Sequence, residues 1–360
     1  NKSDAANGQI NKQFAQGLLM RHYMSLGNYA AAAPLAEDIL NNGGLKLAES
    51  YEDMWLTGNQ IDEETIFTFS FIASTDREFN SEPFLPNGAY GGWSSVVPTH
   101  NLVEAFECID GKTIEESPLY NDEYPYRNRD PRLHASVLYS GQQYPKYASG
   151  YFNSMPEVFK NGEKNPDFWR FTGNSTNTGL NLKKYFRYEN ITSVTHTTLH
   201  FKAMRLAEVI LSLAECYIEQ GTNLEKAAEL MNMTRERAYR NNVYGVEYPK
   251  IVASDQATMR EQVRRERRME LSGEGLRRFD LCRWGLLTQT FQNFAIIHYD
   301  GDLTDEVDEY GDLVAHKTGI EDNPSVNKAN FQTFKDYQRW WPISQGTIDV
   351  TTNIAQTAGY

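Results

Sequence analysis

Two helical hairpins, far apart in the chain, constrain the fold more than any other feature of the sequence. Residues 14–44 and 201–238 each carry apolar side chains at helical spacing on both sides of a glycine. In the first hairpin, with its turn at Gly27-Asn28, we expect one buried stripe on each helix. The stripes are Ala15, Leu18, Leu19 and Tyr23, and then Ala33, Ala36, Ile39 and Leu40. Small alanines let two helices pack closely, which is typical of tetratricopeptide-type units.

The second hairpin is the more apolar of the two. Its first helix, which we expect to include Met204, is apolar nearly all round and is therefore predicted to be buried. Its second helix is predicted to begin with a capping box made by Thr222 and Glu225. In the first hairpin, Pro34 fits a helix only in or near the first turn. Together the hairpins predict a mainly α fold, an α/α scaffold with long loops and a few short strands.

The segment between the hairpins differs in kind. Residues 65–71 alternate at period two and predict a strand, and residues 132–140 and 182–188 predict two more. Residues 98–112 predict a helix that Thr99 caps and that ends before Gly111. Between these elements lie long stretches rich in Gly, Pro, Asn, Ser and Tyr, such as residues 81–95 and 140–169. Loops of this length in a compact protein are usually functional surfaces.

Composition excludes some classes of protein. The 360 residues are 40% hydrophobic and 23% charged, as expected of a folded chain, and the net charge of -13 argues against nucleic acid as a partner. No apolar run approaches the roughly 18 to 20 residues of a membrane-spanning helix. The three cysteines are too far apart for a zinc site and are predicted to be small buried side chains. The first ten residues show neither a signal peptide nor a starting Met, so we expect either processing or an N-terminus further upstream.

Residues 264–285 are unusually basic, with seven arginines and four acidic residues. We expect a helix from Asp255 to Ser272, stopped by glycines, and then a second short helix. Acidic residues lie three or four positions from arginines, so the pairs are predicted to form along the helix. Glu261 would pair with Arg264 and Arg265, and Glu266 and Glu270 with Arg267 and Arg268. This predicts an internal brace of paired arginines, and an anion-binding site remains the alternative.

Four stretches also carry a family resemblance. Residues 266–285 (ERRMELSGEGLRRFDLCRWG) resemble the signature of the SusD/RagB family, the surface nutrient-binding lipoproteins of Bacteroidota. Residues 98–112 (PTHNLVEAFECIDGK), 128–133 (NRDPRL) and 340–349 (WWPISQGTID) resemble further family motifs, in the family's order. The chain departs from the pattern at Ser344 and Thr347, where Pro and Glu are usual, and it lacks the family's N-terminal region with the lipidated Cys.

The resemblance implies a binding protein rather than an enzyme, with no cofactor. Such proteins capture a glycan, or in some members a peptide, and pass it to a SusC-like TonB-dependent transporter in the outer membrane, to whose outer surface the N-terminal Cys anchors them. We therefore expect one SusD-like domain over residues 1–360, N-terminally incomplete. Residues 10–44 and 200–290 would form the helical scaffold, which docks the transporter. Residues 61–199 and 291–339 would form the ligand side.

Loop aromatics are the candidate ligand contacts, because a sugar ring stacks its C–H face on Trp or Tyr. The candidates are Tyr90, Trp93, Tyr124, Tyr126 and Trp169. The alternative for each is that the ring packs beneath its own loop as local core. Trp284, Trp340 and Trp341 lie in family motifs and are predicted to belong to the core.

The acidic segment 300–312 fails the EF-hand pattern, since Asp305 stands where Gly is needed and Gly311 where Glu is needed, so it predicts a solvated loop without metal. The sequence contains no HExxH motif, no G-x-S-x-G motif, no phosphate-binding glycine loop and no dinucleotide-binding fingerprint. Two other functions stay open: a glycoside hydrolase, which would need two facing carboxylates, and a tetratricopeptide scaffold for protein partners.

Overall fold

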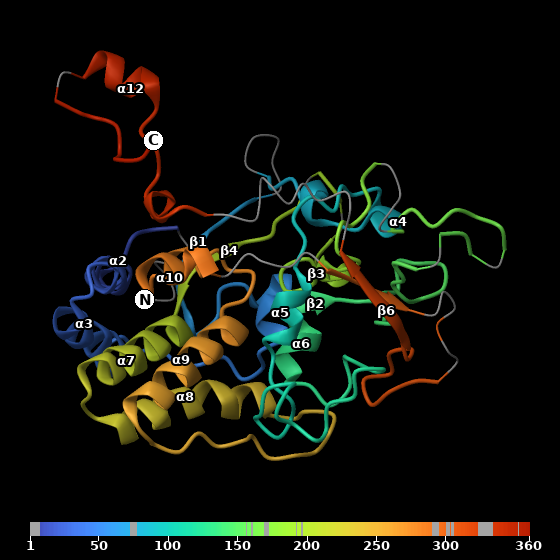
Figure 1. The fold of residues 1–360 in the computed structure, drawn as a ribbon, viewed down its shortest axis with the longest axis horizontal. Coiled ribbons are helices and arrows are strands. Elements are labelled where there is room, and N and C mark those ends of the chain that lie inside the picture. Colours follow the sequence, from blue (N-terminus) through green and yellow to red (C-terminus); the bar gives the residue numbers. More distant parts are fainter. Residues whose placement is uncertain are drawn as a thin grey trace.

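The helices gather in one half of the molecule, and loops with short strands make up the other half (Figure 1). The computed structural model describes residues 8–72, 78–155, 157–159, 161–168, 173–191, 193–195, 197–289, 295–299, 303, 306–322, 334–351 and 353–360. The predicted mainly α fold is confirmed.

The first hairpin consists of α2 (Lys12–Ser25) and α3 (Tyr29–Asn42). The side chains of Asn11 and Asn28 cap the two helices, and Gly27 makes the turn with a φ of 70°. The buried stripe predicted for α3 is confirmed. Pro34, expected in or near the first turn, lies in the second turn of α3 and is exposed.

The stripe predicted for α2 is wrong. The buried side chains of α2 are Phe14, Gly17, Met20 and Met24, whereas Ala15, Leu18 and Leu19 are exposed. The strands that contain Phe67 and Met204 pack against α2, and they determine which of its two apolar faces is buried. Phe14 stacks on Phe67 with ring centroids 4.2 Å apart, and the Met204 side chain lies so close to Gly17 that it would have to shift if this position carried a Cβ atom.

The second hairpin is preceded by a strand. Residues Phe201–Arg205 form β4, which pairs antiparallel with β1 (Thr65–Phe69), so Met204 does not belong to the helix as predicted. The helices are α7 (Leu206–Gln220) and α8 (Leu224–Tyr239). The predicted capping box is also wrong: Asn223 precedes α8 in a left-handed conformation, with a φ of 50° and no side-chain cap.

Helix α7 is the centre of the helical half. It packs against α3, α8 and α9 (Gln256–Glu270), and its buried residues form one apolar core with those of the first hairpin. After α9 the chain turns at Gly273 and Gly275, both with positive φ, into α10 (Arg277–Arg283). Both of these helices are confirmed. Cys108 and Cys216 are buried as predicted, but Cys282 is only half-buried.

The other half contains shorter elements than the sequence predicted. The helix expected over residues 98–112 is only α5 (His100–Glu104), and the strand expected over 132–140 is α6 (Pro131–Ser136) followed by β2 (Val137–Leu138). β2 pairs with β3 (Asn181–Leu182), the remnant of the strand expected over 182–188. β5 (Ala295–Tyr299) pairs with β6 (Lys317–Asp322). The remaining elements are η1 (Asp53–Trp55), η2 (Thr57–Asn59), η3 (Glu82–Phe84), α4 (Asn87–Tyr90), η4 (Tyr188–Asn190), η5 (Leu287–Gln289), η6 (Asp336–Arg339) and α12 (Gln345–Val350).

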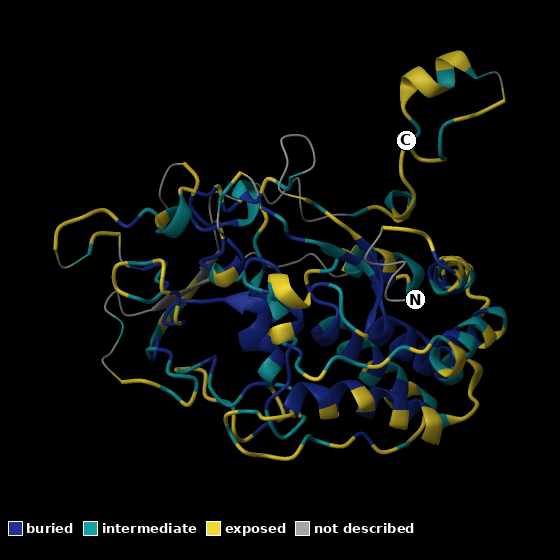
Figure 2. Cartoon of the chain, turned by 180° about the vertical axis from the view of Figure 1, so that it is seen from behind, coloured by how far each residue is buried: buried dark blue, intermediate teal, exposed yellow. Residues whose placement is uncertain are grey.

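The C-terminal segment, with η6 and α12, lies away from both halves and is largely exposed (Figure 2). Trp340 is 57% exposed and Trp341 66%, so their predicted place in the core is wrong. Trp341 contacts the helical half through Arg278, whose guanidinium lies 4.6 Å from its ring centroid. Trp284 is half-buried, and its indole N–H donates to Glu215 at 2.7 Å.

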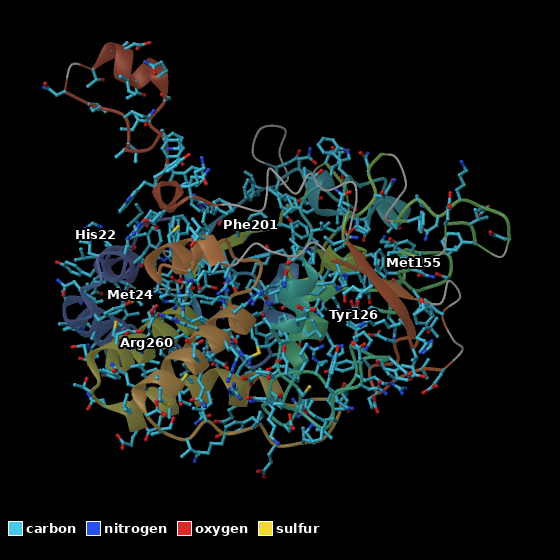
Figure 3. All side chains as sticks on the ribbon, viewed as in Figure 1. His22, Met24, Tyr126, Met155, Phe201 and Arg260 are labelled. Carbon is cyan, nitrogen blue, oxygen red and sulfur yellow. The ribbon has the colours of Figure 1, made fainter. Side chains whose placement is uncertain are left out.

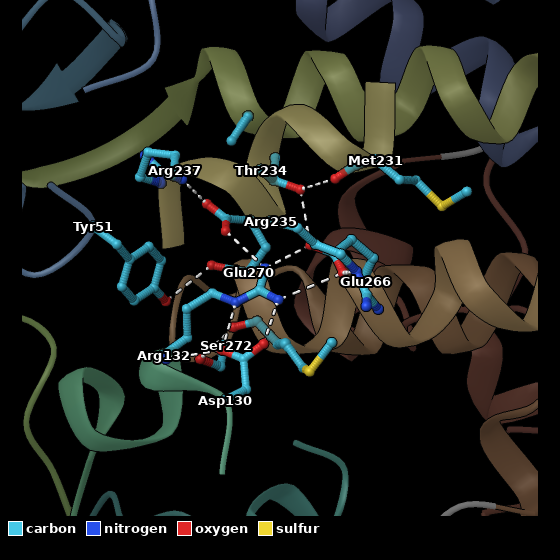
Figure 4. A network of polar contacts seen from close by, with 12 residues as sticks. Tyr51, Asp130, Arg132, Met231, Thr234, Arg235, Arg237, Glu266, Glu270 and Ser272 are labelled. Carbon is cyan, nitrogen blue, oxygen red and sulfur yellow. Dashed lines mark hydrogen bonds and ion pairs between the residues drawn. The ribbon is translucent and has the colours of Figure 1, made fainter. Parts of the chain in front are cut away.

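The predicted internal arginine brace is confirmed in part (Figure 4). In residues 264–285, Arg267 and Arg283 form buried ion pairs, whereas Arg268, Arg277 and Arg278 have no carboxylate partner among the described residues. Glu266 and Glu270 do not pair along α9. Glu270 instead accepts hydrogen bonds from Arg205, Arg237 and Arg132, which come from other elements. Glu266 accepts from Arg132 at 2.6 Å and from Arg235 at 2.9 Å.

Charge compensation in this brace is strong enough to offset burial. Burial opposes the charge of Glu266, yet Arg132 and Arg235 hold its pKa below the usual value. The same balance keeps the pKa of Glu270 well below the usual value, with Arg237, Arg205 and Arg132 as the compensating charges. Because Arg132 belongs to α6 and the other cations to β4 and α8, the brace joins the two halves.

The acidic segment is not simply solvated. Asp312 is buried and accepts hydrogen bonds from the Gln143 amide at 2.8 Å and the Tyr139 hydroxyl at 3.1 Å. Burial raises its pKa to about 6. Asp312 is therefore a buried acidic side chain in the described part of this segment, and its hydrogen bonds connect the loop to the segment that contains Tyr139 and Gln143.

Candidate functional site

Trp93 is the most exposed of the predicted site residues that the structure describes. Its exposed fraction is 42%. The loop beneath it is held by backbone hydrogen bonds: the Trp93 amide donates to Glu82 at 2.7 Å, Ser94 to Leu85 at 3.1 Å, and Ser95 to Pro83 at 2.8 Å. A ring on such a fixed loop loses little conformational entropy when a ligand stacks on it.

Two glycines allow this loop to close. Gly91 ends α4 with a φ of 67°, a left-handed conformation that glycine adopts without strain. Gly92 lies directly against the backbone of Leu85, where a Cβ atom would overlap with the carbonyl oxygen. The Gly-Gly pair is therefore a geometric requirement for the position of Trp93.

Tyr90 lies behind the loop and is half-buried. Its ring meets that of Tyr144 edge-on, with centroids 6.1 Å apart, and burial raises the pKa of its hydroxyl to about 12. Tyr144 in turn contacts Tyr147 and Tyr188 edge-on. Tyr90 is therefore part of an aromatic support for the Trp93 loop, with only part of its ring available to a ligand.

A buried carboxylate fixes the same region. Asp167 accepts hydrogen bonds from the Gly88 amide at 3.1 Å and from the Tyr147 hydroxyl at 2.7 Å, and burial raises its pKa. These bonds join α4 to the segment around residue 167. Sequence reasoning missed Asp167, Tyr147 and Tyr144; the tyrosine-rich run at residues 144–151 is the signal that could have found the aromatic part.

Tyr124 and Tyr126 are neighbours in sequence but differ in environment. Tyr124 is half-buried, with Arg127 5.4 Å from its ring centroid and His316 5.5 Å away. Tyr126, which is labelled in Figure 3, is 5% exposed. Its ring stacks on that of Tyr139, with centroids 3.9 Å apart. Its ring fills the core beneath the loop, so the prediction that Tyr126 contacts ligand is corrected in favour of the packing alternative.

The last predicted contact, Trp169, lies outside the described residues. Of the four candidates that the structure describes, Trp93 is exposed, Tyr90 and Tyr124 are half-buried, and Tyr126 is buried.

In the part of the chain that the structure describes, no group of three or more His, Cys, Asp or Glu side chains is placed to hold a metal ion. None of the described helices combines the length and the apolarity needed to cross a bilayer.

Comparison with known proteins identifies the family. The model of the SusD family matches residues 55–360. The chain belongs to the SusD family. The resemblance carried by the four sequence motifs is thereby confirmed.

Two curated relatives come from Formosa agariphila. This SusD-family chain is 24% identical to SusD-like protein P25 over 295 residues, which cover 79% of the chain and 52% of the relative. It is 23% identical to SusD-like protein P2 over 297 residues, 78% of the chain and 52% of that relative. The chain thus spans about half the length of the curated relatives it matches.

Solved structures share the fold at low identity. A SusD-like protein from Bacteroides fragilis superposes with a TM-score of 0.72 at 23% identity, covering 98% of this chain and 66% of the other. A SusD-like carbohydrate binding protein from the same species gives 0.69 at 24% identity, with coverages of 92% and 64%. Surface glycan-binding protein A from Bacteroides fluxus gives 0.60 at 19% identity, with coverages of 98% and 63%.

Proposed function

We propose that this chain belongs to a surface-exposed outer-membrane protein that captures a nutrient, an oligosaccharide or polysaccharide, without altering it. The observation that carries the proposal is the exposed ring of Trp93 on a loop fixed by its own backbone. An indole offers a flat apolar face to the C–H face of a sugar, and a fixed loop presents that face at little entropic cost.

Family membership supports a glycan as the ligand. Structures with the same fold include one described as a carbohydrate binding protein and one described as a surface glycan-binding protein. Peptide is the alternative ligand within the same role.

The two halves of the molecule would have different roles, one in docking the transporter and one in binding the ligand. The helical scaffold, residues 10–44 and 200–290, would dock a SusC-like TonB-dependent transporter, and the loop-rich segments, residues 61–199 and 291–339, would face the ligand. A lipid on an N-terminal Cys outside this chain would anchor the protein to the outer surface of the outer membrane. Co-purification of the transporter with the tagged protein from outer membranes tests this arrangement.

The decisive experiment is a glycan and peptide array probed with wild type and Trp93→Ala. Truncating a stacking indole is expected to weaken glycan binding about tenfold or more. Trp341→Ala is the matched control, because Trp341 is also exposed but lies in the C-terminal segment. Equal binding by wild type and Trp93→Ala would contradict the assigned site, and binding of peptides alone would replace the glycan by a peptide.

Binding without hydrolysis is tested separately. Labelled glycans that the array identifies are incubated with the protein and then sized. We expect them to keep their length, and shortened products would favour the glycoside hydrolase alternative.

A further inference from the structure

A cavity of about 240 Å³ lies between α5, the end of α9 and α10. Its walls are mainly apolar, with Val97, Leu102, Leu271 and Leu276 among the lining residues. Three arginines are also among the lining residues, Arg267, Arg268 and Arg277. An apolar cavity with a few polar groups is the usual form of a small-molecule site.

The neighbouring arginines are neutralised by carboxylates. Arg267, which also lines the cavity, donates to both oxygens of Asp280 at 3.0 Å. Arg283 pairs with Asp280 at 2.8 Å and with both oxygens of Glu215. Asp280 is therefore already fully engaged by two guanidinium groups and is not available to a third.

Arg268 and Arg277 are exceptions to this pairing. Arg268 donates to the backbone oxygen of Asn101 at 2.5 Å, and no described carboxylate lies within ion-pair distance of it. For Arg277, the described chain provides neither an ion pair nor a hydrogen bond, and its closest aromatic neighbour is Trp284, with 5.9 Å from guanidinium to ring centroid. Among the described residues, these two cations at the cavity therefore have no carboxylate partner.

The surroundings disfavour the charge on both cations. Burial, together with the charge of Arg277, lowers the pKa of Arg268 to about 10, although Glu104 opposes the shift. Burial lowers the pKa of Arg277 as well, with Arg267 and Arg264 contributing, although Asp280 opposes the shift. An anion between the two groups would remove this repulsion and satisfy their free N–H donors.

We propose that Arg268 and Arg277 form an anion-binding pocket that takes the carboxylate or sulfate group of an acidic sugar residue. The guanidinium groups bind the oxyanion, and the leucine and valine side chains contact the sugar ring. The pocket wall at Val97 follows Trp93 by four residues, so one segment of the chain joins the two sites. The sugar assignment rests on the proposed function, whereas the anion-binding chemistry does not.

The test is calorimetric titration of the full chain with four probes. Methyl glucuronoside and glucose 6-sulfate carry the anion on a sugar, methyl glucoside is the neutral ring, and sodium sulfate is the anion alone. We expect the two acidic sugars to bind wild type more tightly than either methyl glucoside or sulfate. Arg268→Gln and Arg277→Gln should each weaken that binding about tenfold or more.

Arg260→Gln is the matched control, because Arg260 lies on the same helix but pairs with Glu219 outside the cavity. Acidic-sugar binding should be unchanged in this variant. Thermal melting checks that each variant folds, and Arg277→Gln should melt no lower than wild type because it removes an unpaired charge. Absence of acidic-sugar binding to wild type, or equal binding by the Arg277→Gln variant, would overturn the pocket.

The outcomes separate this inference from the proposed function. If sulfate alone binds as tightly as the acidic sugars, the sugar assignment is overturned. If the glycan array gives Trp93-dependent binding but the titrations give none, the pocket fails and the proposed function stands. If the titrations succeed while the array shows no effect of Trp93→Ala, the Trp93 site fails and the pocket stands.

Discussion

At the scale of single residues, Glu270 is the most heavily paired carboxylate of the brace. It is fully buried and receives hydrogen bonds from Arg132, Arg205 and Arg237. Taking so many charges from water is costly, so the stability of the brace depends on every charge keeping its partners.

Glu270→Gln is therefore expected to destabilise the protein by about 3–5 kcal/mol, since it leaves three buried guanidinium groups short of one negative charge. Chemical denaturation measures the loss. The control is Glu261→Gln on the same helix, where the pair with Arg264 is 3.4 Å long and Glu261 is 66% exposed. This change should stay within about 0.5 kcal/mol, and similar losses for both variants would contradict the brace.

Asp312 gives a prediction about how the stability of the protein depends on pH. Its folded-state pKa is about 6, raised by burial from a usual value of 3.8, so the folded state favours the protonated carboxyl. Its contribution to stability is full below about pH 4 and is lost as the pH rises through about 6. Relative to Asp312→Asn, wild type should lose up to about 3 kcal/mol of unfolding free energy between those limits. Denaturation of both proteins across this range measures the difference, and a constant difference would refute the assignment.

The residue scale also shows what the sequence could reveal. The pairing of arginines with carboxylates inside the protein was predictable, because residues 264–285 are basic and contain few apolar residues whereas the rest of the chain is acidic. The partners were not, since Glu270 pairs with Arg132 across 138 positions and with Arg205 across 65. Only the fold decides which distant side chains meet, and it also leaves Arg268 and Arg277 without carboxylates.

At the scale of elements, the long helices and strand β1 were predictable, whereas β4 and the short bounds of β2 and β3 were not. α3, α7, α8 and α9 each span three or more turns, enough for the helical period to appear in the sequence. β4 has five residues and runs directly into α7, so its apolar residues extended the helical pattern. α6 was taken for a strand because Pro131–Ser136 is followed at once by the apolar residues of β2.

The Trp93 loop gives the prediction at this scale. Gly92→Ala should weaken glycan binding although it touches no ring, because its Cβ would push against the Leu85 carbonyl and shift the loop. We expect a loss of about tenfold, similar to that of Trp93→Ala. Gly58→Ala is the control, since no atom lies within 4 Å of the added Cβ. Array binding of Gly92→Ala at wild-type strength would show that the loop position is not needed.

At the scale of the whole molecule, the two halves share one buried brace, whereas the C-terminal segment stands apart (Figures 1 and 2). The placement of Trp340 and Trp341 in the core failed because a family motif does not by itself specify burial. Their described contacts with the helical half run through Arg278, which donates to the Gln338 carbonyl at 2.7 Å and lies over the Trp341 ring.

Deleting residues 334–360 should therefore change the melting temperature by no more than about 2 °C and leave Trp93-dependent glycan binding intact. The physical reason is that little apolar surface of this segment is buried: Val350 is 83% exposed and Trp341 66%.

Two tryptophan substitutions give reference values for the loss of stability with which this deletion can be compared. Trp341→Ala should be neutral within about 0.5 kcal/mol, whereas Trp55→Ala should cost about 3–5 kcal/mol, because Trp55 is 1% exposed and packs edge-on against Tyr185 at 4.7 Å. A deletion variant that melts more than about 5 °C below wild type would mean that the segment packs on the body in solution, and Trp341→Ala would then be destabilising as well.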